Sequence, residues 1–466
     1  MLNKRHRDFQ QDQVAALEPM EPRLLMSGDV WVGVVHGSLV IRGDISSNHI
    51  VIDQAGLAAG QFRITGQDGT KVDGQNLRIV SGVTKDVRIG LGDGVDVLEM
   101  AGVAVSRDLT IRGGHSGDTF TVTDGSVGRN VNINAGQGDN TTTIDGTTVS
   151  GRLDVSGGYG TDALTLTGDA SVAGRVSFRP GYGESTCTIN QASVGRLWSS
   201  GRGSASTTLT GATVGGGVTL RNYEGQDSLS INGNSSIDGN LLVDNGNGGS
   251  SSTILSSSID GDVRIVNGEG MDTVLMDIVE GTDDLVAITG HLRISNHNGG
   301  SDVNIAYVDI GGDVRLLGQL GDDVVKVASV GIAGRTQVSL GDGKNQVRMG
   351  LSRFEGNVSV LLGNNDDLVN IGEGGPIHSD SSDHALLPFG AYAQFLHPVN
   401  IRLGGGADSL YLNYQTPAAN LPGGIQADGG EGVDHLYTGL SDKFDHTIIG
   451  IELTDTWPLP DENTPA

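Results

Sequence analysis

Apolar residues recur in this chain with a period of about 22 residues, typical of a solenoid repeat, and within each period they alternate with polar ones. One unit has an alternating stretch at 87–90, a Gly/Asp turn at 92–96, a second alternating stretch at 97–100 and a separate apolar residue, Val105. Strict alternation over a few residues predicts half-buried β-strands. A period in the low twenties predicts that each repeat forms one coil.

Three apolar stations per repeat predict three faces. Equal stations stacked on one another form parallel strands around a continuous core, and parallel strands are joined by right-handed crossovers. We therefore expect an all-β fold, a right-handed parallel β-helix of about 22 residues per coil. About sixteen coils at a strand spacing of ~4.8 Å would form a rod roughly 75 Å long.

One position of the repeat, the frame position, follows the glycine turn and is most often aspartate. Successive members are one period apart in most coils, and the largest gap lies between Asp367 and Asp408. The frame position is occupied in order by Asp96, Asp118, Asn140, Asp162, Ser185, Ala205, Asp227, Ser251, Asp272, Ser301, Asp323, Asn345, Asp367, Asp408 and Asp434.

Composition and charge agree with a solenoid and exclude several functions. The 466 residues include 75 glycines and only 4% aromatics, which suits coils with few large inward side chains and many turns. The formal net charge of −27 argues against nucleic acid as a partner, because surfaces that bind it are basic. No apolar run is long enough for a transmembrane helix, and no motif of an organic cofactor is present.

Breaks in the period divide the chain into four segments. Residues 1–28 are expected to form an N-terminal sorting-type segment without a fixed structure, and residues 29–85 a β-rich cap that covers the first coil. The β-helix itself is expected at 86–440, with insertions near 277–289 and at 375–398. Residues 441–466 are expected to form a C-terminal cap and tail.

The stretch 20–29, Met-Glu-Pro-Arg-Leu-Leu-Met-Ser-Gly-Asp, resembles a Leu-Glu-Pro-Arg-x-Leu-Leu-Ser motif near the N-terminus of large bacterial surface proteins, notably in planctomycetes. Methionine replaces leucine at Met20 and Met26. The resemblance implies export by a non-standard route and a location outside the cell or on its surface. It also implies short strands that lead into Gly-x-Gly-x-Asp repeats, as at 29–85.

The Gly/Asp turns offer candidate metal ligands. Gly-Gly-x-Gly-x-Asp occurs at 157–162 and 429–434, and it resembles the RTX-type repeat in which carboxylates and carbonyls of stacked turns bind Ca²⁺. Here only one such turn occurs per coil, so aspartates that merely accept local backbone N–H bonds are the alternative. The candidate calcium ligands are Asp93, Asp96, Asp118, Asp162, Asp227, Asp272, Asp323, Asp367, Asp408 and Asp434.

Two further columns could bind a ligand at the surface. Arginines recur at Arg107, Arg129, Arg152, Arg175 and Arg196, and then give way to Asn240, Asp262, His291 and Asp313. Stacked guanidinium groups suit anionic glycans, with Arg129, Arg152 and Arg175 as the candidate ligands. Tyr159, Tyr182 and Tyr223, with Arg202 at the missing step, would form a platform for sugars. In both columns, pairing or stacking within the protein is the alternative.

These features favour a non-enzymatic, exported structural or adhesive rod of the bacterial cell surface, with calcium as a candidate stabilising ion and glycans or other envelope components as partners. No catalytic residue is assigned. One alternative is a β-helix lyase or hydrolase acting on polysaccharides, with acids such as Asp322, Asp323, Asp366 and Asp367. A second is a bactofilin-like polymerising scaffold, to which Gly-Asp-Val-Arg-Ile at 261–265 is similar.

Overall fold

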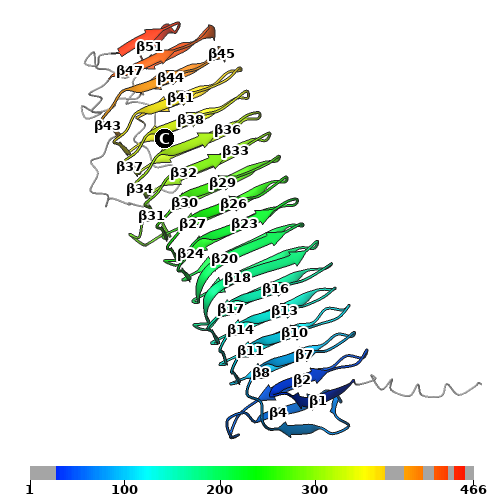
Figure 1. The fold of residues 1–466 in the computed structure, drawn as a ribbon. Coiled ribbons are helices and arrows are strands. Elements are labelled where there is room, and N and C mark those ends of the chain that lie inside the picture. The colour runs from blue at the N-terminus through cyan, green and yellow to red at the C-terminus, as the bar shows by residue number, and fades with distance from the viewer. Residues whose placement is uncertain (1–27, 373–392, 413–423, 439–445, 457–466) are drawn as a thin grey trace, which may run out of the picture.

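The computed structural model describes residues 28–372, 393–412, 424–438 and 446–456, and these coil into a rod of stacked strands (Figure 1). All regular structure in these residues is β-strand, as predicted, and none of them forms a helix that could cross a membrane. Consecutive coils run from the N-terminal end at the bottom of Figure 1 to the C-terminal end at the top. Residues 1–27 of the predicted sorting segment and most of the insertion at 375–398 lie outside the described residues.

The first strands of the coils pair in parallel along the whole rod, and their outward side is called face 1. Each strand is in register with the next, as Val87 with Leu109 and Leu109 with Val131. The first strands are β2 (Ser38–Arg42), β7 (Val87–Gly90), β10 (Leu109–Arg112), β13 (Val131–Asn134), β16 (Leu153–Ser156), β18 (Ser171–Gly181), β20 (Ser193–Gly201), β23 (Val218–Asn222), β26 (Leu241–Asp244), β29 (Val263–Val266), β32 (Leu292–Ser295), β35 (Val314–Leu317), β38 (Thr336–Ser339), β41 (Val358–Leu361), β44 (Val399–Arg402), β47 (Ile425–Asp428) and β50 (His446–Ile449).

The second strands form another parallel sheet, and their outward side is called face 2. Leu98 pairs with Phe120 and Phe120 with Thr142, one coil after another. The second strands are β3 (His49–Asp53), β8 (Val97–Ala101), β11 (Thr119–Thr123), β14 (Asn140–Asp145), β17 (Asp162–Thr167), β19 (Ser185–Asn190), β21 (Ala205–Thr210), β24 (Asp227–Asn232), β27 (Ser250–Leu255), β30 (Asp272–Asp277), β33 (Ser301–Ala306), β36 (Asp323–Ala328), β39 (Gln346–Gly350), β42 (Leu368–Ile371), β46 (Ser409–Leu412), β49 (His435–Thr438) and β51 (Glu452–Thr456).

The third strands are short and lie beside the bend that leads into the next first strand. In β18 and β20 the third and first strands of a coil merge into one long strand. The separate third strands are β9 (Ala104–Val105), β12 (Ser126–Val127), β15 (Thr148–Val149), β22 (Thr213–Val214), β25 (Ser236–Ile237), β28 (Ser258–Ile259), β31 (Val286–Ile288), β34 (Val308–Ile310), β37 (Gly331–Ile332), β40 (Arg353–Phe354) and β43 (Gln394–Phe395).

The core runs along the axis of the rod and is built from the three predicted stations. In the unit that begins at Val87, the inward residues Val87, Leu98 and Val105 are all buried. Stacking continues across the insertion at 375–398, where the rings of Phe354 and Phe395 lie 4.7 Å apart and nearly parallel. Each coil therefore buries only a few apolar residues, and stability comes from stacking between neighbouring coils.

The N-terminal end of the rod is covered by antiparallel strands. Strand β1 (Asp29–Val35) pairs with β2, and β4 (Phe62–Gln67) pairs with both β3 and β6 (Leu77–Val80). Strand β5 (Lys71–Val72) pairs with β1, while β2 and β3 continue in parallel into β7 and β8. At the other end, β45 (Gly405–Gly406) and β48 (Glu431–Gly432) pair at the glycine turns.

The pairing corrects one residue of the predicted frame position. Asp227 pairs with Ser250, whereas the sequence spacing assigned Ser251 to that coil. The step from Asp227 is therefore one residue shorter than predicted, and the step to Asp272 is one residue longer. The pattern misled because three serines follow one another at 250–252, so that composition alone did not distinguish inward from outward positions.

Candidate functional site

The frame aspartates lie inside the wall of the rod, at the corner where each second strand begins. The side chain of each one reaches back to the preceding coil. Asp118 Oδ1 accepts the backbone N–H of Asp96 at 2.9 Å, and Asn140 Oδ1 accepts that of Asp118 at 2.9 Å. Asp96 Oδ1 in turn accepts the N–H of Asn48 at 2.7 Å, so the column begins one coil earlier than predicted.

The same ladder recurs in the C-terminal half of the rod. Asp367 Oδ1 accepts the N–H of Asn345 at 2.7 Å, Asp408 Oδ1 that of Asp367 at 2.7 Å, and Asp434 Oδ1 that of Asp408 at 3.1 Å. Each of these aspartate and asparagine side chains thus satisfies a buried backbone donor in the coil below it. A donor left unpaired there would cost about 1–3 kcal/mol.

The second carboxyl oxygen of these aspartates has a different environment. In the described residues, Oδ2 is buried without a hydrogen-bond partner in Asp96, Asp162, Asp227, Asp272, Asp367, Asp408 and Asp434. Where asparagine occupies the frame, the corresponding Nδ2 donates to turn carbonyls, from Asn140 to Gly138 O at 2.9 Å and from Asn345 to Gly341 O at 2.8 Å. In the coils of Asn140 and Asn345 the corner therefore offers acceptors, which suit an N–H or O–H donor. At Asp118 it offers a donor instead, because Oδ2 accepts the Gly114 N–H at 3.1 Å.

Burial raises the pKa of several frame aspartates. It raises the pKa of Asp96, Asp227 and Asp367 to about 7, although the hydrogen bonds that each accepts lower it. Desolvation penalises the ionised form because the corner excludes water. Neighbouring frame aspartates add to the effect, since the charge of Asp118 raises the pKa of Asp96 and that of Asp408 raises the pKa of Asp367.

The glycine five residues before the frame position explains part of the Gly-Gly-x-Gly-x-Asp pattern. A Cβ at Gly157 would overlap the Oδ2 atom of Asp162, and a Cβ at Gly429 would overlap that of Asp434. The carboxyl group folds back over this glycine and fills the space that any other side chain would need. The first glycine of the motif therefore makes room for the buried aspartate.

The candidate calcium ligands thus occupy two environments. Asp93 lies outside the ladder, on the turn surface, where its Oδ1 is 2.6 Å from His115 Nδ1. The other candidates are all buried frame residues in the ladder column. Within the described part of the chain, no group of three or more His, Cys, Asp or Glu side chains is placed so that it could hold a metal ion.

The acids of the enzyme hypothesis point in opposite directions. Asp323 and Asp367 are buried frame residues. Their neighbours are exposed on the turn, where Asp322 Oδ1 accepts the N–H of Lys344 at 2.8 Å and Asp366 Oδ1 accepts that of Ala407 at 3.0 Å. Adjacent acids in the sequence are therefore separated by the wall of the rod, and both serve inter-coil hydrogen bonds.

The predicted arginine column is two columns. The register aligns Arg152 with Arg175 and with Arg196, but aligns Arg152 with Asn130 in the preceding coil. Arg129 therefore lies one residue earlier on the corner, as does Arg107. Arg129 and Arg152 are 23 residues apart, whereas the paired residues Val131 and Leu153 of the same two coils are 22 apart, and the near-equal spacing of the arginines hid this shift.

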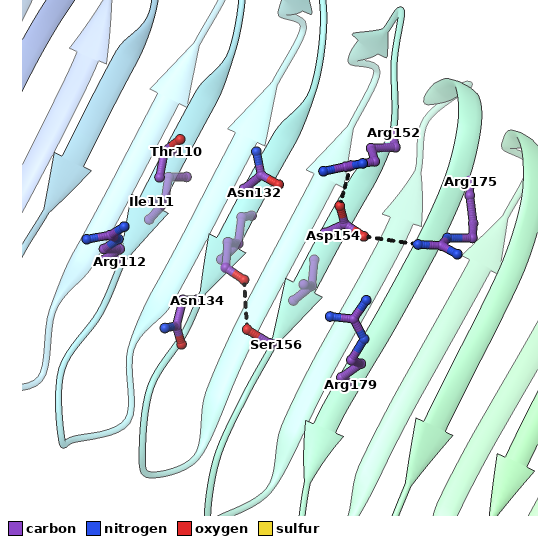
Figure 2. A pocket seen from close by; sticks show the side chains of 12 residues that line it. Thr110, Ile111, Arg112, Asn132, Asn134, Arg152, Asp154, Ser156, Arg175 and Arg179 are labelled. Carbon is purple, nitrogen blue, oxygen red and sulfur yellow. Dashed lines mark hydrogen bonds and ion pairs between the residues drawn. The ribbon is translucent and has the colours of Figure 1, made fainter.

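Arg152 and Arg175 line a pocket on face 1 with a volume of about 580 Å³. Figure 2 shows both arginines directed at Asp154, with Arg152 Nε 2.6 Å and Arg175 Nη2 3.8 Å from its carboxyl oxygens. Arg112 and Arg179 line the same pocket and form no ion pair within the described structure. Four arginines and one aspartate line the pocket, so its lining carries a net charge of +3.

The tyrosine column forms as predicted over part of its length. The rings of Tyr159 and Tyr182 stack with centroids 5.0 Å apart. Arg202 takes the next step, with its guanidinium 4.7 Å from the Tyr182 ring centroid and a hydrogen bond to the Tyr182 hydroxyl. Tyr159, Tyr182 and Tyr223 are each more than half exposed, so this edge is open to solvent.

Two sets of residues were missed in the sequence. One is a ladder of buried asparagines, Asn222, Asn245, Asn267 and Asn296, each five residues before a frame position. Asn245 Nδ2 donates to Asn267 Oδ1, and Asn267 Nδ2 to Asn296 Oδ1, both at 2.8 Å. The constant offset of five from the frame was the signal that could have revealed them.

The other missed set is a series of arginines that project outward from the first strands. They occupy positions between or just after the inward apolar stations, where alternation places them on face 1. All of them are exposed: Arg42, Arg88, Arg112, Arg179, Arg221, Arg264, Arg293, Arg315 and Arg402. Arg264, Arg293 and Arg315 are aligned in three consecutive coils.

Comparisons of the chain with models of known families, with curated proteins and with solved structures find no match. The features of the described surface that suit a ligand are the arginine pocket of face 1 and the tyrosine edge. The frame aspartates, in contrast, are almost entirely buried within the wall.

Proposed function

We propose that this protein is a non-enzymatic, exported structural or adhesive rod of the bacterial cell surface, and that face 1 binds anionic glycans. The observation that carries the glycan proposal is the set of exposed arginines, in two neighbouring files of face 1, on a protein whose net charge is −27. On such a chain, random placement would favour acids, yet the outward ends of the first strands collect guanidinium groups.

The pocket between β10 and β18 is the centre of this surface. Arg112 and Arg179 are free of ion pairs there, and the Arg179 guanidinium lies 5.4 Å from the ring centroid of Trp198, which holds it along the wall. A guanidinium group binds a carboxylate or sulfate through two parallel N–H bonds. Asn132 and Asn134 beside them supply neutral donors and acceptors for sugar hydroxyls.

A linear polymer suits the geometry better than a small ligand. Arg264, Arg293 and Arg315 repeat at the strand spacing of ~4.8 Å and continue the basic surface beyond the pocket. Many weak contacts along a repeating acidic chain add up to firm attachment while each stays individually modest. A rigid rod with such a face would hold a cell to a polymer layer.

Binding to polygalacturonate and alginate, with neutral dextran as the control polymer, tests the glycan proposal. We expect the acidic polymers to bind and their affinity to fall with added salt, because screening weakens exposed charge pairs. The double variant Arg112→Ser/Arg179→Ser should bind about tenfold more weakly or worse. The matched control is Arg348→Ser, which removes an exposed arginine from face 2. Equal loss in this control, or binding that is insensitive to salt, would contradict the proposal.

The cellular location is tested separately. Protease treatment of intact cells should remove the protein while leaving cytoplasmic markers intact, as expected of an exported rod. Full protection in intact cells, with cleavage after lysis, would refute the surface location and leave the glycan measurement unaffected.

A further inference from the structure

Face 2 carries a second regular surface, of different chemistry from face 1. Over seven consecutive coils, from β11 to β27, the central outward residue of the second strand bears a hydroxyl group. This central file consists of Thr121, Thr143, Thr165, Thr188, Thr208, Ser230 and Thr253, aligned coil to coil without a break.

A parallel file lies two residues earlier on each strand. It consists of Thr119, Thr141, Ala163, Thr186, Ser206, Ser228 and Ser251, so alanine interrupts it only once. Together the two files form a two-dimensional lattice of hydroxyls. The pairing between these strands contains no bulge or register shift, so the lattice keeps one spacing along the rod.

This hydroxyl lattice is almost free of charge. Among the outward residues of β11, β14, β17, β19, β21, β24 and β27, the only charged one is Asp145, which lies outside both files. The rest of the chain carries a large net negative charge. A neutral strip of this length on an acidic rod indicates a partner that is itself neutral.

Few of the hydroxyls are used within the protein. In the described residues of the two files, Ser228 Oγ donates to Ser206 Oγ at 2.9 Å, and Ser230 Oγ accepts a hydrogen bond from Asn232 Nδ2 at 3.0 Å. The file two residues earlier on each strand is largely exposed, and the central file is half-buried. Threonine is restricted at χ1, so its hydroxyl and methyl groups keep nearly the same direction from one coil to the next.

The spacing of the hydroxyl groups distinguishes between possible neutral partners. Hydroxyls repeat at ~4.8 Å along the rod and at ~6.7 Å along each strand. Water molecules joined tetrahedrally by bonds of ~2.75 Å have second neighbours ~4.5 Å apart and an axial repeat of ~7.3 Å. The mismatch is about 0.3 Å in one direction and about 0.6 Å in the other, which a layer of waters bonded to the hydroxyls can absorb.

Other neutral partners fit the face less well. Sugar rings are usually held by stacking on aromatic side chains, and the outward positions of the two files include none. Protein interfaces rely on Trp, Tyr and Arg at their centres, whereas Ser and Thr rarely contribute. We therefore propose that face 2 from β11 to β27 binds ordered water at the surface of ice. This proposal is independent of glycan binding by face 1.

Ice recrystallisation and thermal hysteresis of the full-length protein test the proposal. We expect the protein to slow recrystallisation and to shape growing crystals. The double variant Thr165→Lys/Thr188→Lys places two charged chains in the centre of the lattice and should reduce the activity about tenfold or more. The matched control, Thr110→Lys/Thr219→Lys, makes the same change at half-buried outward positions of face 1 and should keep full activity.

The melting temperature of both double variants establishes that they are folded. A second control is Thr188→Ser, which keeps the hydroxyl group and should retain most of the ice activity. The proposal is overturned if the wild-type protein affects ice no more than an unrelated soluble protein does. It is also overturned if the face 2 lysines leave the ice activity intact. Two other results would also overturn the ice proposal: side-by-side dimers, or binding to microcrystalline cellulose, if the face 2 lysines abolish them. Either result would assign the lattice to that partner.

Discussion

At the scale of single residues, the two carboxyl oxygens of a frame aspartate differ in hydrogen bonding. Oδ1 completes a ladder of inter-coil hydrogen bonds, as from Asn345 N–H to Asp367. Oδ2 of Asp367 is buried without a partner. Asn345, one coil away, places a donor at the corresponding position and reaches two turn carbonyls. The corner thus favours a neutral side chain that can donate, which an aspartate provides only when it is protonated.

This predicts a stabilising substitution. At pH 8, Asp367→Asn should raise the free energy of unfolding by about 1–3 kcal/mol, because an N–H donor replaces an unpaired buried acceptor. The reverse change, Asn345→Asp, is the control and should destabilise the rod at the same pH. Urea unfolding measures both, and a loss of stability in Asp367→Asn would contradict this account of the corner.

The pH dependence follows from the raised pKa values. Burial raises the pKa of Asp367 from 3.8 to about 7, so the folded state holds this proton more tightly than the unfolded state does. The stability contributed by the proton is complete below about pH 4 and is lost as the pH rises through about 7. Unfolding curves at pH 5 and pH 8.5 should differ more in the wild type than in Asp367→Asn. Equal differences in the two proteins would show that this carboxyl group does not titrate as inferred.

Calcium at the frame aspartates stays a prediction. A calcium ion would bind the Oδ2 oxygens, where the proton is held at lower pH, together with turn carbonyls. Calcium binding is favoured above pH 7, where these carboxyl groups are ionised. The expected result is a higher melting temperature with Ca²⁺ than with a chelator, reduced in Asp367→Asn. A melting curve that the chelator leaves unchanged at pH 8.5 would end the calcium hypothesis.

At the scale of elements, the buried asparagine ladder connects β24 to β33 through their preceding turns. Asn267 is fully buried; its Oδ1 accepts bonds from Asn245 Nδ2 and Ser250 Oγ, and its backbone oxygen is 2.6 Å from His297 Nδ1. These contacts pin the turns of three neighbouring coils to one another. The ladder lies where the frame position is serine in two of the coils, so the asparagines supply polar contacts that aspartate provides elsewhere.

Removal of the central member should therefore loosen this part of the rod. Asn267→Ala is expected to lower the free energy of unfolding by about 1–3 kcal/mol, because Asn245 and Asn296 lose buried partners. Hydrogen exchange should quicken in β26 and β29 before it does in β10 and β13. Asn132→Ala, at an outward position of face 1, is the control and should change neither quantity. Uniform faster exchange along the whole rod would argue against a local ladder.

At the scale of the whole molecule, the rod is a stack whose ends are open sheets unless they are covered. Strands β1 and β4 pair antiparallel with β2 and β3, and β6 pairs antiparallel with β4, which ends the parallel stack at the N-terminal side. An uncovered edge offers a row of unpaired N–H and C=O groups to another chain. The cap therefore prevents the end coil of one molecule from pairing with the end coil of another.

Deletion of the segment 29–85 should convert the rod into an associating species. The exposed edges of β7 and β8 are expected to pair with the edges of other molecules, so light scattering should show oligomers that grow with protein concentration. The full-length chain is the control and should remain a single species under the same conditions. A monomeric, folded deletion variant would show that β7 and β8 need no cover.

The coil, its period and its three inward stations follow from the repeat pattern alone, because alternation and stacking are local rules that recur in every coil. The positions of the side chains between the stations depend on how neighbouring coils pair in three dimensions. Pairing with the neighbouring coil determines that Asp96 and Asp367 turn inward and that Ser250 occupies the frame position. It also determines that Arg129 lies one residue away from the position of Arg152. Spacing alone does not record a one-residue shift. The two faces likewise emerge only when strands are aligned, since arginines and threonines scattered in the sequence become a row and a lattice through register.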